Sequence, residues 1–457
     1  MSLPRYEQYK DSGVEWLGEV PAHWDIYTLK QIVSQPITDG PHETPNFPHE
    51  GIPFVSAEAV SSGKIDFTKI RGFISQEDHL QYSKKYRPQI GDIYMVKSGA
   101  TTGVTAIVET EQEFNIWSPL AAIRCSHRAV PFFVLNFIRS RNFQEAVTLN
   151  WSFGTQQNIG MKVIENLAVA LPPVAEQTAI AAFLDRETAK MDDLIAEQRN
   201  LIGLLKEKRQ ALISHAVTKG LDPAAPMKDS GVEWLGKVPK HWDVTRLKFV
   251  AKVQTGIAKG KDNTGKKTIA VPYLRVANVQ NGYLALDDIS TIAIPVEEMA
   301  RYRLQQGDVL MNEGGDFDKL GRGHVWKCAI DNCIHQNHVF AVRPITICSE
   351  WLNQITSSDY AQFYFMTRAK QSTNLASISS TNIMELPVVI PLVVEQQSIL
   401  HFLDHETTKI DDLVTEAETA TILLQERRTA LISAAVTGKI DVRNRVAVQP
   451  APELEVA

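Results

Sequence analysis

The sequence is poor in cysteine and has no long apolar run. Both absences limit the cellular compartments in which we expect the protein. Four cysteines in 457 residues (Cys125, Cys328, Cys333 and Cys348) are too few for a disulfide scaffold. The first residues lack the basic-then-apolar order of a secretory signal. No segment approaches the roughly 20 apolar residues that span a bilayer. We therefore expect a soluble protein of the reducing cytoplasm with no membrane partner.

Sequence signatures of catalysis are also missing. The chain has no Asn-Pro-Pro-aromatic box and no glycine-rich cofactor loop after a predicted strand. The nearest approach to a nucleotide-binding loop is Gly260–Lys267 (GKDNTGKK), where Lys267 replaces the Ser or Thr of a P-loop. The next residues, Thr268–Leu274, predict a strand instead of the helix that a P-loop requires. We expect no catalytic residue and no cofactor.

Charge is low overall but unevenly distributed. The formal net charge of -6 argues against a polycation that binds any nucleic acid. The segment Val238–Val276 nevertheless carries nine lysines and arginines against two aspartates, Asp243 and Asp262. This segment predicts a local basic surface.

An internal repeat dominates what the sequence contains. Lys10–Trp24 (KDSGVEWLGEVPAHW) recurs as Lys228–Trp242 (KDSGVEWLGKVPKHW). A second matched pair runs from Glu176 to Ser214 and from Glu395 to Ser433. The residues between the matched segments differ, so one scaffold is predicted to present two different surfaces.

The divergent parts predict mixed α/β domains, because short β-branched and aromatic runs alternate with Gly, Pro and Asn. The expected organisation is a first domain with its repeat box, a helical segment, a second domain, a second helical segment and a flexible tail. Their expected bounds are 1–170, 171–222, 223–389, 390–440 and 441–457. The paired tryptophans Trp16, Trp24, Trp234 and Trp242 are expected to anchor each domain to this scaffold.

Apolar residues in both helical segments follow a 3-4 spacing, which predicts a heptad seam. The seam residues are Met191, Ile195, Ile202, Leu205 and Leu212 in the first segment and Ile410, Val414, Leu424 and Leu431 in the second. We expect two helices of about 45 to 55 Å that pair antiparallel within one chain. The polar Gln198, Arg209 and Arg428 are candidates for setting the register. The alternatives are helices packed on their own domains, or a homodimeric coiled coil.

This arrangement resembles the specificity subunit of type I restriction-modification systems. The resemblance rests on Leu171–Gln177 (LPPVAEQ), Ile390–Gln396 (IPLVVEQ), the two Trp-Leu-Gly-x-Val-Pro-x-His-Trp boxes and Lys97–Gly103 (KSGATTG). The second copy departs from the pattern at Leu392, where the first has Pro173, and at Met311–Asp318, where the glycine box is weaker. Base-contacting residues are therefore not transferred between the copies.

The resemblance implies a non-catalytic DNA-specificity subunit of an endonuclease and adenine methyltransferase complex. Each divergent domain is then a target recognition domain that reads one half of a bipartite, asymmetric double-stranded DNA target. The helices set the spacing of the halves and dock two methyltransferase subunits, and restriction/translocase subunits join them. The family's helix motifs place Glu176, Gln177, Glu395 and Gln396 with the seam residues in this partner-binding spacer. The alternative is an interaction scaffold that does not bind DNA.

The candidate DNA-binding residues form three groups. The basic loop contributes Lys259, Lys261, Lys266 and Lys267, the glycine box contributes Lys97, Ser98, Thr101 and Thr102, and the polar turns before the helical segments contribute Gln156, Gln157, Asn158 and Asn382. Lysines neutralise phosphates, whereas Asn and Gln pair with adenine edges. The alternatives are a solvated loop for the first group and a helix-capping turn for the third. A zinc site at Cys328, Cys333, His335 and His338 is disfavoured, because their spacing matches no common finger.

Overall fold

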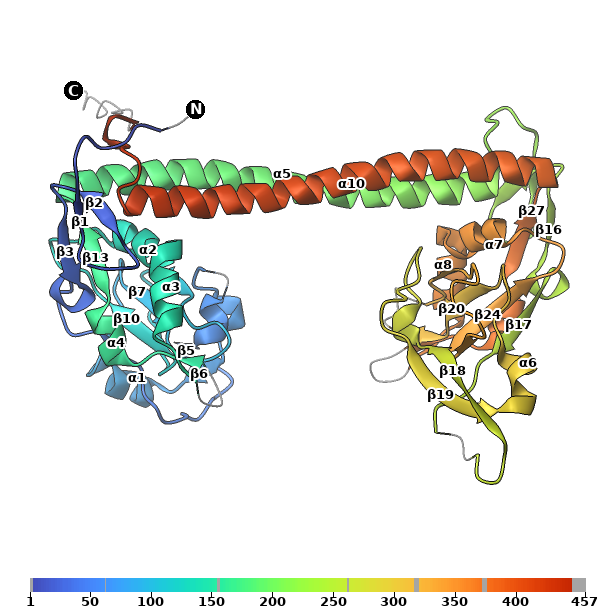
Figure 1. Ribbon diagram of the computed structural model, residues 1–457, viewed down its shortest axis with the longest axis horizontal. Coiled ribbons are helices and arrows are strands. Elements are labelled where there is room, and N and C mark those ends of the chain that lie inside the picture. The colour runs from blue at the N-terminus through green and yellow to red at the C-terminus, as the bar shows by residue number, and fades with distance from the viewer. Residues whose placement is uncertain are drawn as a thin grey trace. The chain divides into compact units, whose positions relative to one another are not determined.

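The computed structural model describes residues 3–61, 63–153, 157–260, 263–315, 320–371 and 376–445. The chain divides into two compact units, one formed by Met1–Gln198 with Thr419–Ala457 and the other by Arg199–Glu418. Each unit contains one globular copy of the repeat and parts of two long helices, α5 (Val174–Lys219) and α10 (Val393–Val436) (Figure 1). The expected mixed fold with two repeated domains and two long helices is confirmed.

Short strands and helices build the first unit. They are β1 (Tyr9–Asp11), β2 (Glu19–Pro21), β3 (Asp25–Thr28), β4 (Thr38–Asp39), β5 (Ile52–Val55), β6 (Gly72–Ile74), α1 (Gln76–Ser83), β7 (Ile93–Val96), β8 (Thr105–Ile107), β9 (Asn115–Ile116), β10 (Leu120–Ile123), α2 (Pro131–Arg139), α3 (Arg141–Leu149), β11 (Ser152–Phe153), β12 (Gln157–Asn158), α4 (Met161–Asn166) and β13 (Ala168–Leu171).

The second unit has elements of the same kinds. They are β14 (Met227–Asp229), β15 (Lys237–Pro239), β16 (Asp243–Arg246), β17 (Ala251–Thr255), β18 (Thr268–Leu274), β19 (Ser290–Pro295), α6 (Met299–Tyr302), β20 (Val309–Asn312), β21 (Gly314–Gly315), β22 (Gly323–Val325), β23 (Ile334–His335), β24 (Val339–Pro344), α7 (Ser349–Thr356), α8 (Asp359–Arg368), β25 (Lys370–Gln371), β26 (Ala376–Ser377), α9 (Ser380–Met384) and β27 (Pro387–Ile390).

The sheets of the two units match strand for strand. The order β4-β10-β7-β8 in the first unit corresponds to β17-β24-β20-β22 in the second, and β6-β5-β9 corresponds to β19-β18-β23. In both units the strand after the repeat box pairs antiparallel with the strand before the long helix, as β3 with β13 and as β16 with β27. The divergent sequences therefore keep one backbone plan, because the buried strands β7, β10 and β20 remain fully apolar apart from Asn312.

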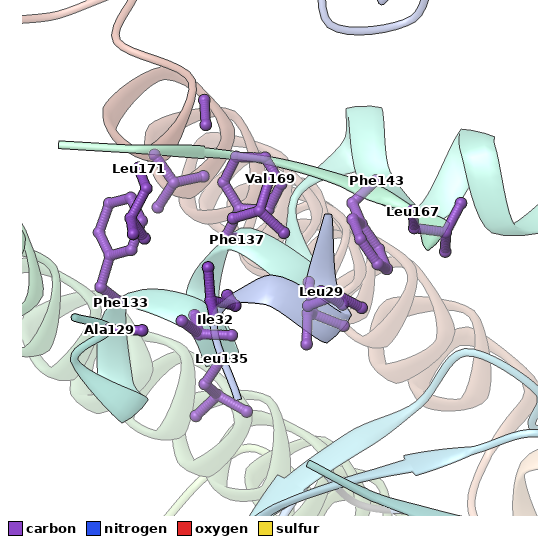
Figure 2. Packing of buried hydrophobic residues seen from close by; sticks show 14 of the residues in the cluster. Leu29, Ile32, Ala129, Phe133, Leu135, Phe137, Phe143, Leu167, Val169 and Leu171 are labelled. Carbon is purple, nitrogen blue, oxygen red and sulfur yellow. The ribbon is translucent and has the colours of Figure 1, made fainter. Parts of the chain in front are cut away.

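The core of each unit includes both long helices. In the first unit α2 and α3 contribute Phe133, Phe137 and Phe143, which pack with Leu29 and Val169 (Figure 2). The members of this core from the helices are Ile180, Phe183 and Leu184 of α5 and Ile432, Ala435 and Val436 of α10. The corresponding members in the second unit are Ile399 and Leu403 of α10 and Ile213, Ala216 and Val217 of α5.

Of the four tryptophans expected to anchor the domains to the scaffold, Trp24 and Trp242 belong to the cores that include both long helices, and Trp24 Nε1 donates to Glu176 of α5 at 3.0 Å. Trp234 is 38% exposed and lies beside Phe363 and Tyr364 of α8. Trp24 and Trp242 are completely buried in the two cores, beside Phe133 and Trp351 respectively. Trp16 packs edge-on against Phe143 in the first unit.

The two helices run antiparallel within each unit, which confirms the intramolecular pairing. Every predicted seam residue is buried or half-buried, whereas most positions between them are exposed. In the first unit Arg428 donates to Asp192 Oδ2 at 3.2 Å, and in the second Arg209 Nε donates to Asp411 Oδ1 at 2.9 Å. Exposed ion pairs contribute at most about 1 kcal/mol, so these matched pairs favour one register more than they stabilise the fold.

Two expectations from the sequence are wrong. The helices have 46 and 44 residues, about 69 and about 66 Å at about 1.5 Å per residue, which exceeds the expected 45 to 55 Å. The seam omits the first turns of each helix, which pack on their own domain through residues such as Phe183. The expected flexible tail is also wrong for its first residues, because Val442 is buried and Asp441 N donates to Pro4 O at 2.8 Å. Residues 446–457 lie outside the described residues.

A buried carboxylate precedes the central strand of the main sheet in both units. Asp92 accepts from Arg124 Nε and Nη2, both at 2.7 Å, and Asp308 accepts from Arg343 Nε and Nη2 at 2.7 and 2.8 Å. Donation of these hydrogen bonds to the carboxylates raises the pKa of Arg124 and of Arg343. The pairs tie β7 to β10 and β20 to β24.

No helix in the described part of the chain combines the length and the apolar character that crossing a membrane requires.

We expect Arg343→Met to destabilise the second unit by about 3 kcal/mol, because Asp308 would stay buried with an uncompensated charge. Hydrogen exchange measured by mass spectrometry should show faster exchange in β20 and β24, with β7 and β10 unchanged. The matched variant Arg124→Met should give the reverse pattern. Unchanged exchange in β20 and β24 of Arg343→Met would contradict a structural role for this pair.

Candidate nucleic-acid interface

The glycine box of the first domain forms a tight loop after β7. Gly99 and Gly103 have φ of 106° and 96°, which side chains rarely tolerate, so glycine is required at both positions. A Cβ on Gly103 would also lie 2.5 Å from Gln144 Oε1. The loop is therefore held in one conformation by its backbone.

The structure brings this loop together with the polar turn before α4. Gly99 N donates to Gln157 O at 3.0 Å, Ile159 N donates to Lys97 O at 2.9 Å, and Ser98 forms an isolated bridge with Asn158. Two candidate groups that are about 60 residues apart in the sequence thus share one surface. Gln156 lies outside the described residues.

The candidate side chains in this loop differ in what they can reach. Asn158 is exposed, and Gln157, Ser98 and Thr101 are half-buried. Thr102 is buried, and its hydroxyl donates to Gly99 O at 2.7 Å. Thr102 therefore holds the loop, and the other four residues are better placed to contact a ligand.

Lys97 is held by an acidic neighbour. Its side chain is 12% exposed, and its Nζ lies 3.3 Å from Asp39 Oδ2. Burial alone would raise the pKa of Asp39, but the hydrogen bond from Lys85 and the charges of Lys85 and Lys97 outweigh it and lower that pKa. Lys97 thus forms part of an ion-pair cluster.

The second domain has the same loop position with different side chains. Ile378 N donates to Glu313 O at 2.9 Å, just as Ile159 N donates to Lys97 O in the first domain. By this register Glu313 occupies the place of Lys97, and Ser377 occupies that of Asn158. A base in one copy therefore corresponds to an acid in the other.

Sequence reasoning missed this second group of residues. Glu313 Oε2 lies 2.7 Å from His338 Nδ1, and Ser377 and Gln371 are exposed on the adjacent strands. The weak glycine box at Met311–Gly315 marked the place, but its side chains gave no signal. The shared hydrogen-bond register places Glu313 and Ser377 at the positions of Lys97 and Asn158.

The basic loop lies between β17 and β18, which confirms the predicted strand and excludes a P-loop helix. Lys259, Lys266 and Lys267 are exposed, and within the described ranges no acidic side chain pairs with them. Lys261 lies outside the described residues. Unpaired exposed lysines suit the neutralisation of phosphates.

Asn382 takes part in the structure of its own turn. Ser379 caps α9 by accepting from Asn382 N at 3.2 Å, and the Asn382 side-chain amide donates to Arg368 O at 3.0 Å. The capping alternative thus describes this turn better, although Asn382 also lines a cleft of about 500 Å³ with Arg246, Tyr364 and Arg368.

The disfavoured zinc assignment finds no geometric support. His335 is buried, with Nδ1 2.7 Å from Val339 O, and Cys328 is exposed. In the part of the chain that the structure describes, no three His, Cys, Asp or Glu side chains gather as metal ligands do.

The long helices carry a second apolar stripe beside their seam. Leu201 and Leu204 of α5 and Leu413 of α10 are exposed in the second unit, and Leu194 and Leu423 are exposed in the first. Leu194 and Leu413, like Leu204 and Leu423, occupy matching positions of the repeat. Exposed leucines at helical spacing are typical of a surface that binds another helix.

The Glu-Gln motifs at the helix starts form hydrogen bonds within the chain. Gln177 donates to Pro172 O at 2.8 Å and accepts from Val130 N at 2.7 Å, and Gln396 donates to Pro391 O at 2.9 Å. Glu176 is buried and accepts hydrogen bonds from Tyr6 and Trp24. In the first copy these bonds join the domain to the start of α5.

Comparison with known proteins agrees with this geometry. The family described as Type I restriction modification DNA specificity domain matches residues 21–203 and again residues 239–422. The chain is 21% identical over 440 residues to the type I restriction enzyme EcoKI specificity subunit of Escherichia coli (strain K12), covering 94% of this chain and 91% of that protein. It is 21% identical over 438 residues to the StySPI specificity subunit of Salmonella potsdam, with the same coverage.

A solved structure shows the same fold. It is described as concerning complex assembly and conformational transition of the type I restriction-modification system, and the likeness has a TM-score of 0.67 at 17% identity. The likeness covers 91% of this chain and 98% of that chain. Because the family matches include both copies of the repeat, the chain belongs to the type I restriction-modification DNA specificity family.

Proposed function

We propose that this chain is the non-catalytic, DNA-reading subunit of a type I restriction-modification complex, and that each domain reads one half of a bipartite, asymmetric target. The observation that carries the proposal is the pair of matched loops with different side chains, Lys97–Asn158 in one copy and Glu313–Ser377 in the other. One backbone plan with two different reading surfaces suits two different half-sites.

The second part of the proposal concerns the helices. We assign α5 and α10 to spacing the half-sites and to docking two methyltransferase subunits, with restriction/translocase subunits joining the assembly in the cytoplasm. The matched exposed leucines Leu194 and Leu413, and Leu204 and Leu423, support docking of two identical partners. For domain exchange we take the boundaries at 1–170, 171–222, 223–389 and 390–440.

Co-expression with the methyltransferase from the same genome, followed by single-molecule sequencing for methylated adenine, tests the proposal. One bipartite motif should appear, and replacing residues 1–170 by a relative's domain should change one half of it. A stable complex that methylates no motif would favour an interaction scaffold over a DNA reader.

We expect Asn158→Ala to relax the half-site read by the first domain. Loss of one amide contact to a base costs about 1–3 kcal/mol, so methylation of the cognate half-site should fall about 5- to 150-fold. The matched variant Ser377→Ala should affect the other half-site. Methylation patterns identical to those of the unaltered chain would exclude both residues from base reading.

The basic loop should act through phosphates. In Lys266→Gln/Lys267→Gln, DNA affinity of the assembled complex should fall for all sequences, and the slope of log K against log salt should decrease by about 2. Fluorescence anisotropy over a salt series measures this. The control Lys190→Gln/Lys409→Gln removes two lysines that pair with Glu187 and Glu406, and it should leave the slope unchanged. Equal slopes in both variants would remove the loop from the interface.

The apolar stripe should bind the methyltransferase. Leu201→Glu/Leu204→Glu places charges where a partner helix would bury leucine, so co-purification of the methyltransferase should be lost at one of two sites. Native mass spectrometry reports the stoichiometry. Glu207→Ala/Lys208→Ala, on the same helix, is the control. Full occupancy in the leucine variant would place the partner elsewhere.

A further inference from the structure

A buried carboxylate at the start of α5, Glu176, has hydrogen-bond partners from its own domain at both oxygens. Glu176 Oε1 accepts from Tyr6 Oη at 2.7 Å and from Trp24 Nε1 at 3.0 Å, and Glu176 Oε2 lies 2.8 Å from His23 Nε2. The Glu176 side chain is 7% exposed. Burial and the hydrogen bond to Glu176 raise the pKa of Tyr6, so its hydroxyl stays a donor.

The matched carboxylate at the start of α10 has fewer partners. Glu395 Oε2 lies 2.8 Å from His241 Nε2, as in the first copy, but its side chain is 30% exposed. Trp242, the counterpart of Trp24, is completely buried, yet among the described residues no group accepts from its Nε1. In the first copy the acceptor of the matching N–H is the carboxylate itself, Glu176 Oε1, so Glu395 is the group that corresponds to the absent acceptor, and an indole N–H buried without an acceptor costs about 1–3 kcal/mol.

The surroundings of Gly220 show that the Trp242 indole and the Glu395 carboxylate lie near the same point. A Cβ built on Gly220 would lie 3.3 Å from Trp242 Cζ2 and 3.7 Å from Glu395 Oε1. Cζ2 belongs to the edge of the indole ring that also carries Nε1. The indole edge and the carboxylate therefore flank one point at the end of α5.

The connectivity of the chain explains why the second copy has no tyrosine at the position of Tyr6. In the first copy two segments meet at the carboxylate, since Asp441 N donates to Pro4 O and the Arg443 guanidinium lies 5.0 Å from the Tyr6 ring. In the second copy one continuous segment, which joins the end of α5 to the repeat box, takes the place of these two segments. Ala224 precedes the second repeat box by the same number of residues as Tyr6 precedes the first. Ala224 N also donates to Asp222 Oδ1, just as Arg443 N donates to Asp441 Oδ1, so Ala224 corresponds to Arg443 as well.

We propose that the Glu395–Trp242 site of the second copy is a docking site for a tyrosine side chain of a partner protein, which takes the place that Tyr6 holds in the first copy. The first copy supplies the chemistry of the occupant, which is a phenol that donates to the carboxylate and packs edge-on against the indole. The exposed residues Leu392, Val393 and Val394 directly precede Glu395 and offer apolar contact to the segment that carries the tyrosine. The site is independent of DNA reading.

A phenol probe tests the site on the full chain. With ¹⁵N-labelled indoles, the resonances of Trp24 and Trp242 are assigned with Trp→Phe variants, and p-cresol is then titrated. The Trp242 Nε1–H resonance should shift and that of Trp24 should not. Toluene, which lacks the hydroxyl, should shift neither. A Trp242 resonance that does not respond, or that responds equally to toluene, overturns the proposal.

Three variants serve as matched controls. Tyr6→Ala should make the Trp24 resonance sensitive to p-cresol, which shows that the method detects a freed site. Glu395→Gln should weaken the response of Trp242, and Ala224→Tyr should abolish it by supplying the tyrosine from within the chain. A full response in Ala224→Tyr would contradict the equivalence of position 224 with position 6.

The partner is tested separately, and this step alone rests on the proposed function. Glu395→Gln should weaken methyltransferase binding about tenfold, which is the effect of one hydrogen bond to a charged group, while Glu395→Asp should recover part of it. Photo-crosslinking from a benzoylphenylalanine at position 237 should recover a tyrosine-containing peptide of the methyltransferase. Unchanged binding with a positive p-cresol response keeps the phenol site and excludes this partner. Loss of DNA reading without loss of the p-cresol response affects the proposed function alone.

Discussion

Each globular domain is completed by helical segments from two distant parts of the chain. The first core contains the start of α5 and the end of α10, and the second contains the start of α10 and the end of α5. Ile432, Ala435 and Val436 in one core correspond to Ile213, Ala216 and Val217 in the other. Because neither domain can bury its apolar face without the far helix, the antiparallel pairing of α5 and α10 is a condition for both cores, and the other features depend on it.

This constraint distinguishes the parts of the structure that are the same in both copies from the parts that differ. The fixed parts are the tryptophan boxes, the Glu-Gln helix starts and the ion pairs Asp92–Arg124 and Asp308–Arg343, which hold strands and helices in register. The variable parts are loops such as Lys97–Gly103 and Glu313–Gly315, whose backbone positions are held by the fixed parts. A rigid frame allows loop side chains to change without loss of the fold.

The two copies also differ where the chain ends. The first copy receives separate N-terminal and C-terminal segments at Glu176, whereas the second receives one continuous segment at Glu395. The two copies of the repeat, whose boxes are nearly identical in sequence, thus have chemically different ends. The Tyr6 hydroxyl and the Arg443 guanidinium fill the first. In the second, Ala224 has no hydroxyl to donate to Glu395, and among the described residues no group accepts from the indole of Trp242.

The sequence alone determined the repeat, the mixed domains and the seam of the helices, because these depend on local periodicity and on direct identity between two segments. Residues such as Met191 and Ile410 occupy the predicted seam for that reason. The tertiary structure decided which side chains share a surface. Ser98 and Asn158 meet only because β12 lies next to the loop after β7. Thr102 is buried because its hydroxyl donates to Gly99 O. Glu313 corresponds to Lys97 by the hydrogen-bond register. Such contacts join residues far apart in the sequence, and local spacing carries no signal of them.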